Sequence, residues 1–135
     1  MSSRAKSFDY AVSLDPTWDA RSDRGGGVLA GAEEASWTPE HLVLAGLGRC
    51  TLTSLRYHCV RAGVTLTSSS TVRGTVTRRE TDGRFAFVDI AFDGEVSFEP
   101  RPDEPTIADL LAKAERDCFV GASLTAAPSY TWNVS

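Results

Sequence analysis

The feature that most limits what this chain can fold into is a long, proline-free helical segment from Thr38 to Gly63. Thr38 is a good N-cap, Pro39 suits the first helical position, and Glu40 places a negative charge at the positive end of the helix dipole. Gly63 is a typical stop signal. The first half is apolar on most sides, which predicts a helix buried all round rather than one lying on a surface.

Period-two alternation on both sides of this helix predicts strands. Residues 8–14 read as a strand with one buried face, and a short strand follows at 28–29. Residues 64–80 and 85–98 form a predicted hairpin that turns at Thr81-Asp82-Gly83, with a bulge expected at Asp93-Gly94. A second helix is predicted over about 105–116, a short helical turn within 119–125, and a last strand at 130–134. The order β-β-α-β-β-α-β predicts an α+β fold, an antiparallel sheet with helices on one face.

Length and composition narrow the function classes. A chain of 135 residues predicts one domain, residues 1–135. The net charge of −4 argues against nucleic-acid binding, which needs a basic face. No apolar run reaches the roughly 20 residues that a membrane-spanning helix requires. The N-terminal residues do not form a secretory signal, so we expect a cytoplasmic protein.

The three cysteines, Cys50, Cys59 and Cys118, contain no close C-x-x-C pair. This pattern argues against a disulfide scaffold and a structural zinc site, and it leaves open both reactive thiols and buried small hydrophobes. Cys59 follows Cys50 by nine residues and faces the other side of the helix, as a structural or partly exposed thiol. His41 and His58 lack partners at metal-ligand spacing and are expected at the helix surface or in caps. We therefore expect no metal and no cofactor.

Two segments carry a family resemblance. The stretch T38-P-E-H-L-V-L-A-G-L-G-R-C50 resembles the central-helix motif of the OsmC/Ohr family of thiol peroxidases. The later stretch A-E-R-D-C118-F-V-G-A-S123 resembles the second-cysteine motif of that family, except that Phe119 stands where the family usually has proline. The resemblance covers nearly the whole chain. It implies an OsmC-like fold, with antiparallel sheets packed around a long central helix in an intertwined homodimer.

The same resemblance implies a peroxidase that reduces organic hydroperoxides, alkyl or fatty-acid, to alcohols. Cys50 would be oxidised by the peroxide and Cys118 would resolve it as a disulfide. Glu40 matches the family's glutamate, and the family's arginine would come from the N-terminal turn, as Arg21 or Arg24. Arg24, beside the glycine run, is preferred. The family suggests a lipoyl-type dithiol as reductant.

The chemistry of a thiol explains this residue set. A cysteine with its ordinary pKa of about 8.5 is mostly protonated at neutral pH, and burial raises the pKa further. A nearby arginine stabilises the thiolate and the developing charge on the peroxide oxygen, while a glutamate compensates the buried arginine. Trp18, Trp37 and Phe119 favour an apolar substrate pocket. The alternative is a non-catalytic dimeric protein of the same fold that binds a small apolar ligand.

Helix geometry predicts the dimer. Glu40 and Cys50 lie ten residues apart, about 15 Å along one straight helix, which is too far for both to contact one guanidinium. Two copies of the helix crossing antiparallel near Ala45-Gly46 would bring Glu40 of one chain to Cys50 of the other. Gly46 and Gly48, each unfavourable in a helix by about 1 kcal/mol, predict close approach of another backbone.

Overall fold

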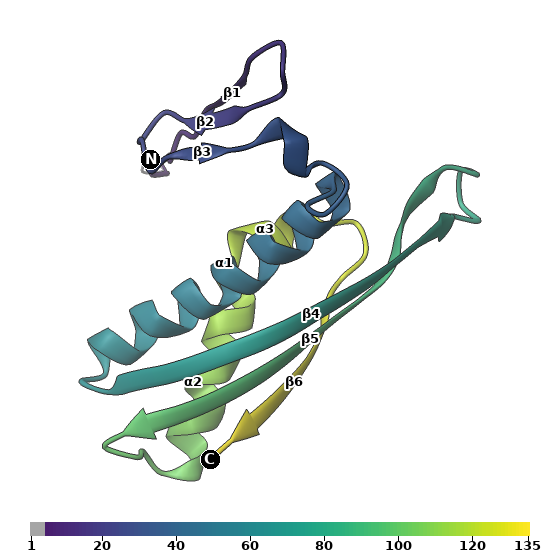
Figure 1. Ribbon diagram of the computed structural model, residues 1–135. Coiled ribbons are helices and arrows are strands. Elements are labelled where there is room, and N and C mark those ends of the chain that lie inside the picture. The colour runs from purple at the N-terminus through teal and green to yellow at the C-terminus, as the bar shows by residue number, and fades with distance from the viewer. Residues whose placement is uncertain (1–4) are drawn as a thin grey trace. The chain divides into compact units, whose positions relative to one another are not determined.

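The computed structural model describes residues 5–135, and their contacts group into two compact units. The N-terminal unit ends at His41 and the C-terminal unit begins at Leu42. Figure 1 labels the elements of both. No helix among residues 5–135 combines the length and the apolar character needed to cross a membrane.

The N-terminal unit holds a small antiparallel sheet in the order β1-β2-β3. Its strands are β1 (Val12–Leu14), β2 (Ala20–Ser22) and β3 (Val28–Leu29), followed by the 3-10 helix η1 (Gly31–Glu33). The predicted strand at 28–29 is confirmed. The predicted strand over 8–14 is shorter than expected, and its expected buried face is wrong. Val12 and Leu14 are 65% and 63% exposed.

Helix α1 (Pro39–Arg61) confirms the predicted central helix. The Thr38 hydroxyl accepts a hydrogen bond from the His41 backbone N–H at 3.2 Å, which is an N-cap contact. Gly63 adopts φ +72°, the left-handed conformation that ends helices. Burial all round is wrong: Leu42 is 40% exposed. Apart from Gly48, the buried positions form one stripe at a spacing of four residues, Leu47, Thr51, Leu55 and Cys59.

The sheet of the C-terminal unit has the order β4-β5-β6. Strands β4 (Thr65–Arg78) and β5 (Phe85–Glu99) form the predicted antiparallel hairpin. Strand β6 (Ser129–Val134) pairs with β5 in parallel, so the wholly antiparallel sheet expected from the sequence is mixed. The long crossover from β5 to β6 permits this pairing. It contains the two predicted helical segments, α2 (Glu104–Arg116) and α3 (Phe119–Ser123).

The bulge expected at Asp93-Gly94 is wrong, since the register of the hairpin shifts between Thr75 and Val76 instead. Gly94 is required for packing. A Cβ atom at this position would lie 2.6 Å from the ring of Trp132, its register partner on β6. The glycine therefore makes room for an aromatic ring rather than for an extra residue.

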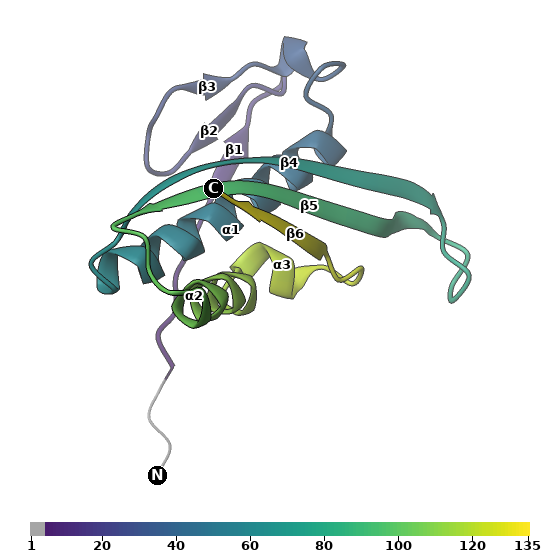
Figure 2. The same cartoon turned by 90° about the horizontal axis from the view of Figure 1, so that it is seen from below.

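Helices α1, α2 and α3 lie on the same side of the β4-β5-β6 sheet (Figure 2). Every second residue of β5 points into the space between, from Ile90 to Phe98, as the two-residue period of a strand requires. One apolar cluster joins α1, α2 and the sheet around Leu55, Cys59 and Leu110. A second joins α1, β5 and the start of α3 around Leu47, Ile90 and Cys118. The second cluster contains the candidate site.

Candidate active site

The structure brings Cys50 and Cys118 together inside the C-terminal unit. Cys50 lies on α1, and Cys118 is the N-cap residue of α3. Both belong to the apolar cluster around Leu47 and Ile90, and the two thiols are near enough for Cys118 to raise the pKa of Cys50. Neither residue is in a disulfide in this structure. Two thiols in contact within an apolar cluster can form a disulfide when one of them is oxidised.

The pKa of the half-buried Cys50 thiol is raised by some of its neighbours and lowered by others. Its pKa is raised, and burial is the largest cause. The Val120 backbone N–H opposes this by donating a hydrogen bond to the sulfur, whereas the neighbouring Cys118 raises the pKa further; the Phe119 N–H lowers it. The net effect favours the thiol over the thiolate. Within the C-terminal unit, Cys50 is therefore mostly protonated at neutral pH.

Cys118 is completely buried, and its sulfur accepts two hydrogen bonds. The Thr51 hydroxyl donates at 3.3 Å, and the Gly121 backbone N–H also donates at 3.3 Å. Thr51 is itself fully buried, and its oxygen lies 3.5 Å from the Tyr130 hydroxyl. Sequence analysis missed Thr51 and Tyr130. The sequence held one signal for Thr51. It is a polar residue midway between Leu47 and Leu55, four residues from each, on the buried stripe of α1.

The third cysteine is structural. Cys59 is completely buried in the cluster with Leu55 and Leu110, and burial raises the pKa of its thiol. The expected structural role therefore fits this position, while the partial exposure allowed for it in the sequence analysis is wrong. The buried stripe of α1 includes both Leu47 and Cys59, so Cys59 packs on the helices and sheet of the C-terminal unit.

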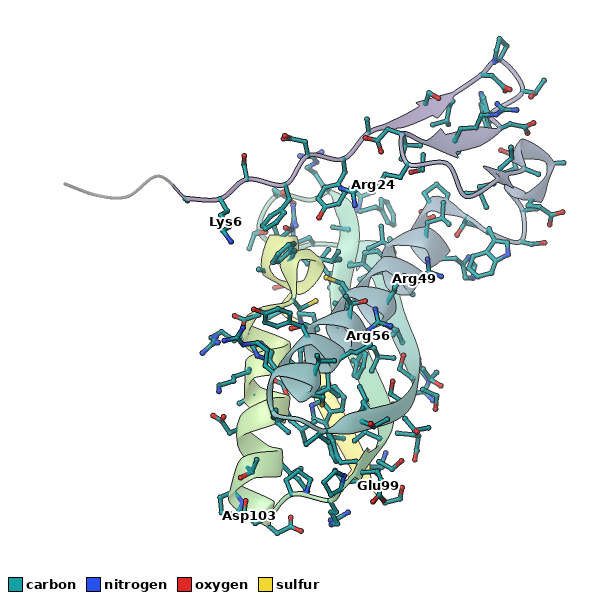
Figure 3. All side chains as sticks on the ribbon, turned by 90° about the vertical axis from the view of Figure 1, so that its left-hand side faces the viewer. Lys6, Arg24, Arg49, Arg56, Glu99 and Asp103 are labelled. Atoms are coloured by element: carbon teal, nitrogen blue, oxygen red, sulfur yellow. The ribbon has the colours of Figure 1, made fainter. Side chains whose placement is uncertain are left out.

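The other predicted site residues lie in the N-terminal unit, each in its own setting. Arg21 forms an exposed ion pair with Asp15 at 3.3 Å. Arg24, labelled in Figure 3, stacks on the ring of Tyr10 and lies 4.7 Å from its centroid. Glu40 is exposed in the first turn of α1. An association of these three residues with the two thiols stays a prediction.

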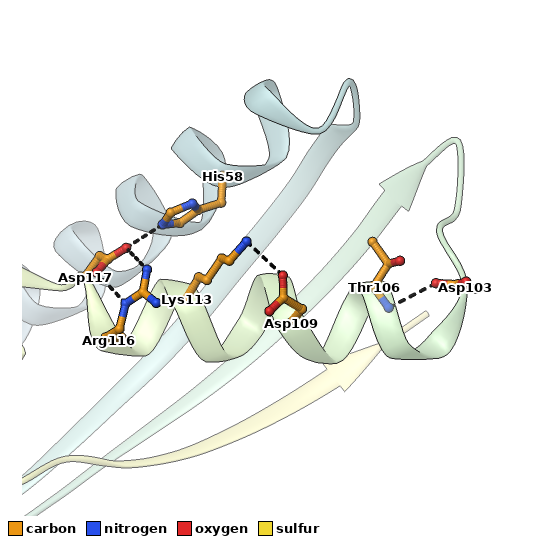
Figure 4. A network of polar contacts seen from close by, with 7 residues as sticks. All are labelled: His58, Asp103, Thr106, Asp109, Lys113, Arg116 and Asp117. Atoms are coloured by element: carbon orange, nitrogen blue, oxygen red, sulfur yellow. Dashed lines mark hydrogen bonds and ion pairs between the residues drawn. The ribbon is translucent and has the colours of Figure 1, made fainter.

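The histidines differ from each other. His41 contacts the Thr38 hydroxyl through Nδ1 at 2.6 Å, in agreement with the predicted capping role. The His58 side chain is only 14% exposed, so its expected surface position is wrong. Its Nε2 lies 2.8 Å from Asp117, the residue before Cys118 (Figure 4). Within residues 5–135, no group of three or more metal-ligating side chains is arranged to hold an ion.

Asp117 connects α1 to the end of α2. It accepts hydrogen bonds from Arg116 at 2.8 and 2.9 Å as well as the contact with His58. The Arg116 guanidinium, and after it His58, lower the pKa of Asp117 to about 2. The carboxylate is therefore charged across the physiological range, one residue away from Cys118.

Comparison with known protein families identifies the family to which this chain belongs. A family model described as OsmC-like protein matches residues 31–133, which include both cysteine segments. The chain belongs to the OsmC-like family. The resemblance noted in the sequence is thus confirmed, together with the α+β fold of that family.

Solved structures agree with this assignment. An OsmC-like protein from Mycoplasma pneumoniae is 19% identical with a TM-score of 0.68, covering 98% of this chain and 98% of that chain. The organic hydroperoxide resistance protein OhrB of Bacillus subtilis is 19% identical with a TM-score of 0.60, covering 95% and 98%. An OsmC-like protein of unknown function from Vibrio cholerae is 12% identical with a TM-score of 0.72, covering 86% and 83%. No curated protein matches this chain. At such identities the likeness shows the fold alone.

Proposed function

We propose that this protein is a thiol peroxidase that reduces organic hydroperoxides through Cys50 and Cys118. The observation that carries the proposal is the contact of the two thiols in one apolar cluster. Helices α1 and α3 bring the half-buried Cys50 thiol next to the fully buried Cys118 thiol. A two-cysteine redox pair needs such proximity to form its disulfide. A protein that only holds an apolar ligand has no need of this contact, so the binding alternative is not favoured.

The reaction proceeds in two steps on these sulfurs. The Cys50 thiolate attacks the terminal oxygen of R-O-OH; an S–O bond forms, the O–O bond breaks, and the alkoxide takes a proton to become the alcohol. Cys50 is now a sulfenic acid. Cys118 then attacks the Cys50 sulfur; the S–S bond forms, the S–O bond breaks, and the hydroxide leaves as water with the proton from Cys118. An external dithiol reduces the disulfide by exchange.

The substrate class rests on two supports. The cluster beside Cys50 is built from apolar side chains, among them Leu44, Val72 and Phe87, which favour an alkyl or fatty-acid chain over hydrogen peroxide. The similar Bacillus subtilis protein is named for organic hydroperoxide resistance. A cycle between free thiols and a disulfide also suits a reducing compartment, and it favours a cytoplasmic location and a dithiol partner of lipoyl type.

The remaining site residues complete the proposal. Arg24 or Arg21 would stabilise the Cys50 thiolate, and Glu40 would hold that arginine. We place Glu40 in the partner copy of a homodimer, because one helix separates it from its own Cys50 by about 15 Å. The arginine has to counter the burial that raises the pKa of Cys50.

The test is mass spectrometry of the intact protein and its peptides after one equivalent of cumene hydroperoxide, with hydrogen peroxide as comparison. We expect a rapid Cys50–Cys118 disulfide, formed faster with the organic peroxide. Cys118→Ser should stop at oxidised Cys50, and Cys50→Ser should consume no peroxide. Cys59→Ala is the matched control and should react like the natural protein. Thiols that stay reduced in the natural protein, or oxidation of Cys59 alone, would contradict the proposal.

A further inference from the structure

A short line of hydroxyl groups reaches Cys118 through the core of the C-terminal unit. The Tyr130 hydroxyl on β6 lies 3.5 Å from the Thr51 hydroxyl on α1, which donates to the Cys118 sulfur at 3.3 Å. The Gly121 N–H donates to the same sulfur. Thr51 is the one buried polar residue in the core of the part of the chain that the structure describes. A buried hydroxyl must be hydrogen-bonded to offset the free energy of its desolvation. The Thr51 hydroxyl makes this hydrogen bond to the sulfur atom of Cys118.

The direction of these hydrogen bonds follows from counting protons. A threonine hydroxyl has one proton, which Thr51 gives to Cys118; its lone pairs can then only accept, so Tyr130 donates to it. Burial, the largest cause, raises the pKa of Tyr130, so the phenol keeps its proton at neutral pH and can act as this donor. Each donor therefore points toward the sulfur.

Two donors hold the Cys118 sulfur as an acceptor, one from the Thr51 hydroxyl and one from the Gly121 backbone. Hydrogen bonds to a charged acceptor are stronger than those to a neutral one, so both donors bind this sulfur more strongly when it gives up its proton to attack. Helical threonines commonly return the hydroxyl to a carbonyl of the preceding turn. The Thr51 hydroxyl is aimed at Cys118 instead, one residue from Cys50, where the second chemical step takes place.

We propose that Thr51 is a catalytic residue of the second step, with Tyr130 as its positioning residue. The Thr51 hydroxyl holds the Cys118 sulfur as an acceptor while that sulfur attacks the sulfenic acid of Cys50. The S–S bond forms, the S–O bond breaks, and water leaves with the proton that Cys118 gave up. This inference rests on the proposed function, since it assigns a residue to the resolving step of the same site.

The test isolates that step from peroxide chemistry. In a Cys59→Ala background, an aromatic disulfide reagent such as Ellman's reagent converts Cys50 to a mixed disulfide and releases one coloured thiolate. Attack by Cys118 on the Cys50 sulfur then releases a second. We expect Thr51→Val, which keeps the shape and removes the hydroxyl, to slow the second release roughly tenfold, the effect of one lost hydrogen bond. Thr51→Ser, which restores the hydroxyl, should recover most of the rate.

Two further variants separate the roles. Thr53→Val makes the same chemical change at an exposed position of α1, two residues away, and should leave the second release unchanged. Tyr130→Phe should slow it less than Thr51→Val, and the double variant should be no slower than Thr51→Val, because Tyr130 acts through Thr51. Equal unfolding temperatures of Thr51→Val and Thr51→Ser would show that both retain the fold.

The outcomes distinguish this inference from the proposed function. A Thr51→Val variant as fast as the natural protein, or a Thr51→Ser variant as slow as Thr51→Val, would overturn the inference while leaving peroxidase activity intact. In another outcome, the second thiolate is released fast and in a Thr51-dependent way by a protein that reduces no peroxide. That result would overturn the proposed function, while the role of Thr51 in the attack by Cys118 would stand. Absence of any second release in the natural protein would overturn both, because Cys118 would then not reach Cys50.

Discussion

At the scale of single residues, Cys50 shows why contact between two thiols is not enough for reactivity. Burial raises the pKa of its thiol, and the Val120 and Phe119 N–H groups only partly offset this. A thiol in that state supplies little thiolate at pH 7, and the thiolate is the attacking species. The proposed chemistry therefore requires a positive charge beside Cys50 in the working protein. Arg24 and Arg21 are the two residues that the sequence offers for this role.

Removing the arginine that stabilises the Cys50 thiolate should lower the rate of peroxide reduction at neutral pH and make this rate more dependent on pH. A cation lowers the pKa of the neighbouring thiol, so its loss leaves less thiolate at pH 7 and moves the rise in rate to higher pH. We expect Arg24→Ala to slow peroxide reduction by roughly tenfold or more, with partial recovery as the pH increases. The measurement is the second-order rate of peroxide consumption across the pH range.

Arg21→Ala is the matched control, since it removes the same charge from the same unit. Arg21 is paired with Asp15 in an exposed position, and we expect its loss to change the rate little. The opposite pattern, with Arg21→Ala slow and Arg24→Ala unaffected, would transfer the role to Arg21. Two unaffected variants would remove both from the site.

At the scale of elements, the sequence predicted what local signals determine. Thr38, Pro39 and Gly63 mark the ends of α1 because caps and left-handed glycines act within a few residues. The Thr81-Asp82-Gly83 turn located the β4–β5 hairpin for the same reason. The two cysteine segments were found through the family resemblance and not through local signals, and in the structure they lie in one apolar cluster.

Contacts between distant segments could not be predicted in this way. The need for a glycine at position 94 depends on the ring of Trp132, which lies on another strand. The parallel pairing of β6 depends on how α2 and α3 cross the sheet. The contacts from Thr51 to Cys118 and from His58 to Asp117 each span more than 50 residues of sequence. Sequence periodicity indicates whether a segment is a helix or a strand, and it does not identify the segment that packs against it.

The contact between α1 and the end of α2 gives a prediction for stability. Arg116, and then His58, hold the pKa of Asp117 at about 2, below its ordinary value of 3.8. The folded state thus binds the proton of Asp117 less readily than the unfolded state. The resulting stabilisation is fully present above about pH 4 and is lost as the pH falls toward 2. Asp117→Asn should remove this part of the acid sensitivity and lower the free energy of unfolding at pH 7.

The measurement is urea unfolding of both proteins at several pH values from 2 to 7. The two stability curves should approach each other as the pH falls through the interval from about 4 to 2. Asp109→Asn is the control on the same helix, because it breaks an exposed pair with Lys113 at 2.9 Å and should change stability by about 0.5 kcal/mol or less. A constant difference between natural and Asp117→Asn protein at every pH would contradict the role of the carboxylate charge.

At the scale of the whole molecule, the N-terminal unit has no buried side chain among its described residues, 5–41. Its strands contain two or three residues each, and Tyr10, Val12, Leu14 and Val28 are at least half exposed. Sheets this small are rarely stable without an apolar surface to cover them. We therefore keep two predictions together: residues 1–135 form one domain, and this domain works as a homodimer in which a second copy covers exposed apolar surface.

Gly46 provides the test of that dimer. Among residues 5–135, no other side chain or strand lies within 4 Å of a Cβ atom built at Gly46, so within one chain Gly46→Ala should stabilise α1 by about 1 kcal/mol. If two copies of α1 cross near Ala45-Gly46, the added methyl group separates the helices. We then expect Gly46→Ala to weaken the dimer, measured by sedimentation equilibrium at micromolar concentration, and to reduce peroxidase activity along with it.

Gly48→Ala provides the contrast on the same helix. A Cβ atom there would lie 3.1 Å from Val72 of β4, so this change should lower the unfolding temperature through contacts inside one chain. Its effect on association should follow from the loss of fold alone. A natural protein that is monomeric at micromolar concentration would contradict the dimer, as would a Gly46→Ala variant that is more stable and equally dimeric. A dimer lost selectively in Gly46→Ala would explain a glycine in mid-helix that no contact among residues 5–135 requires.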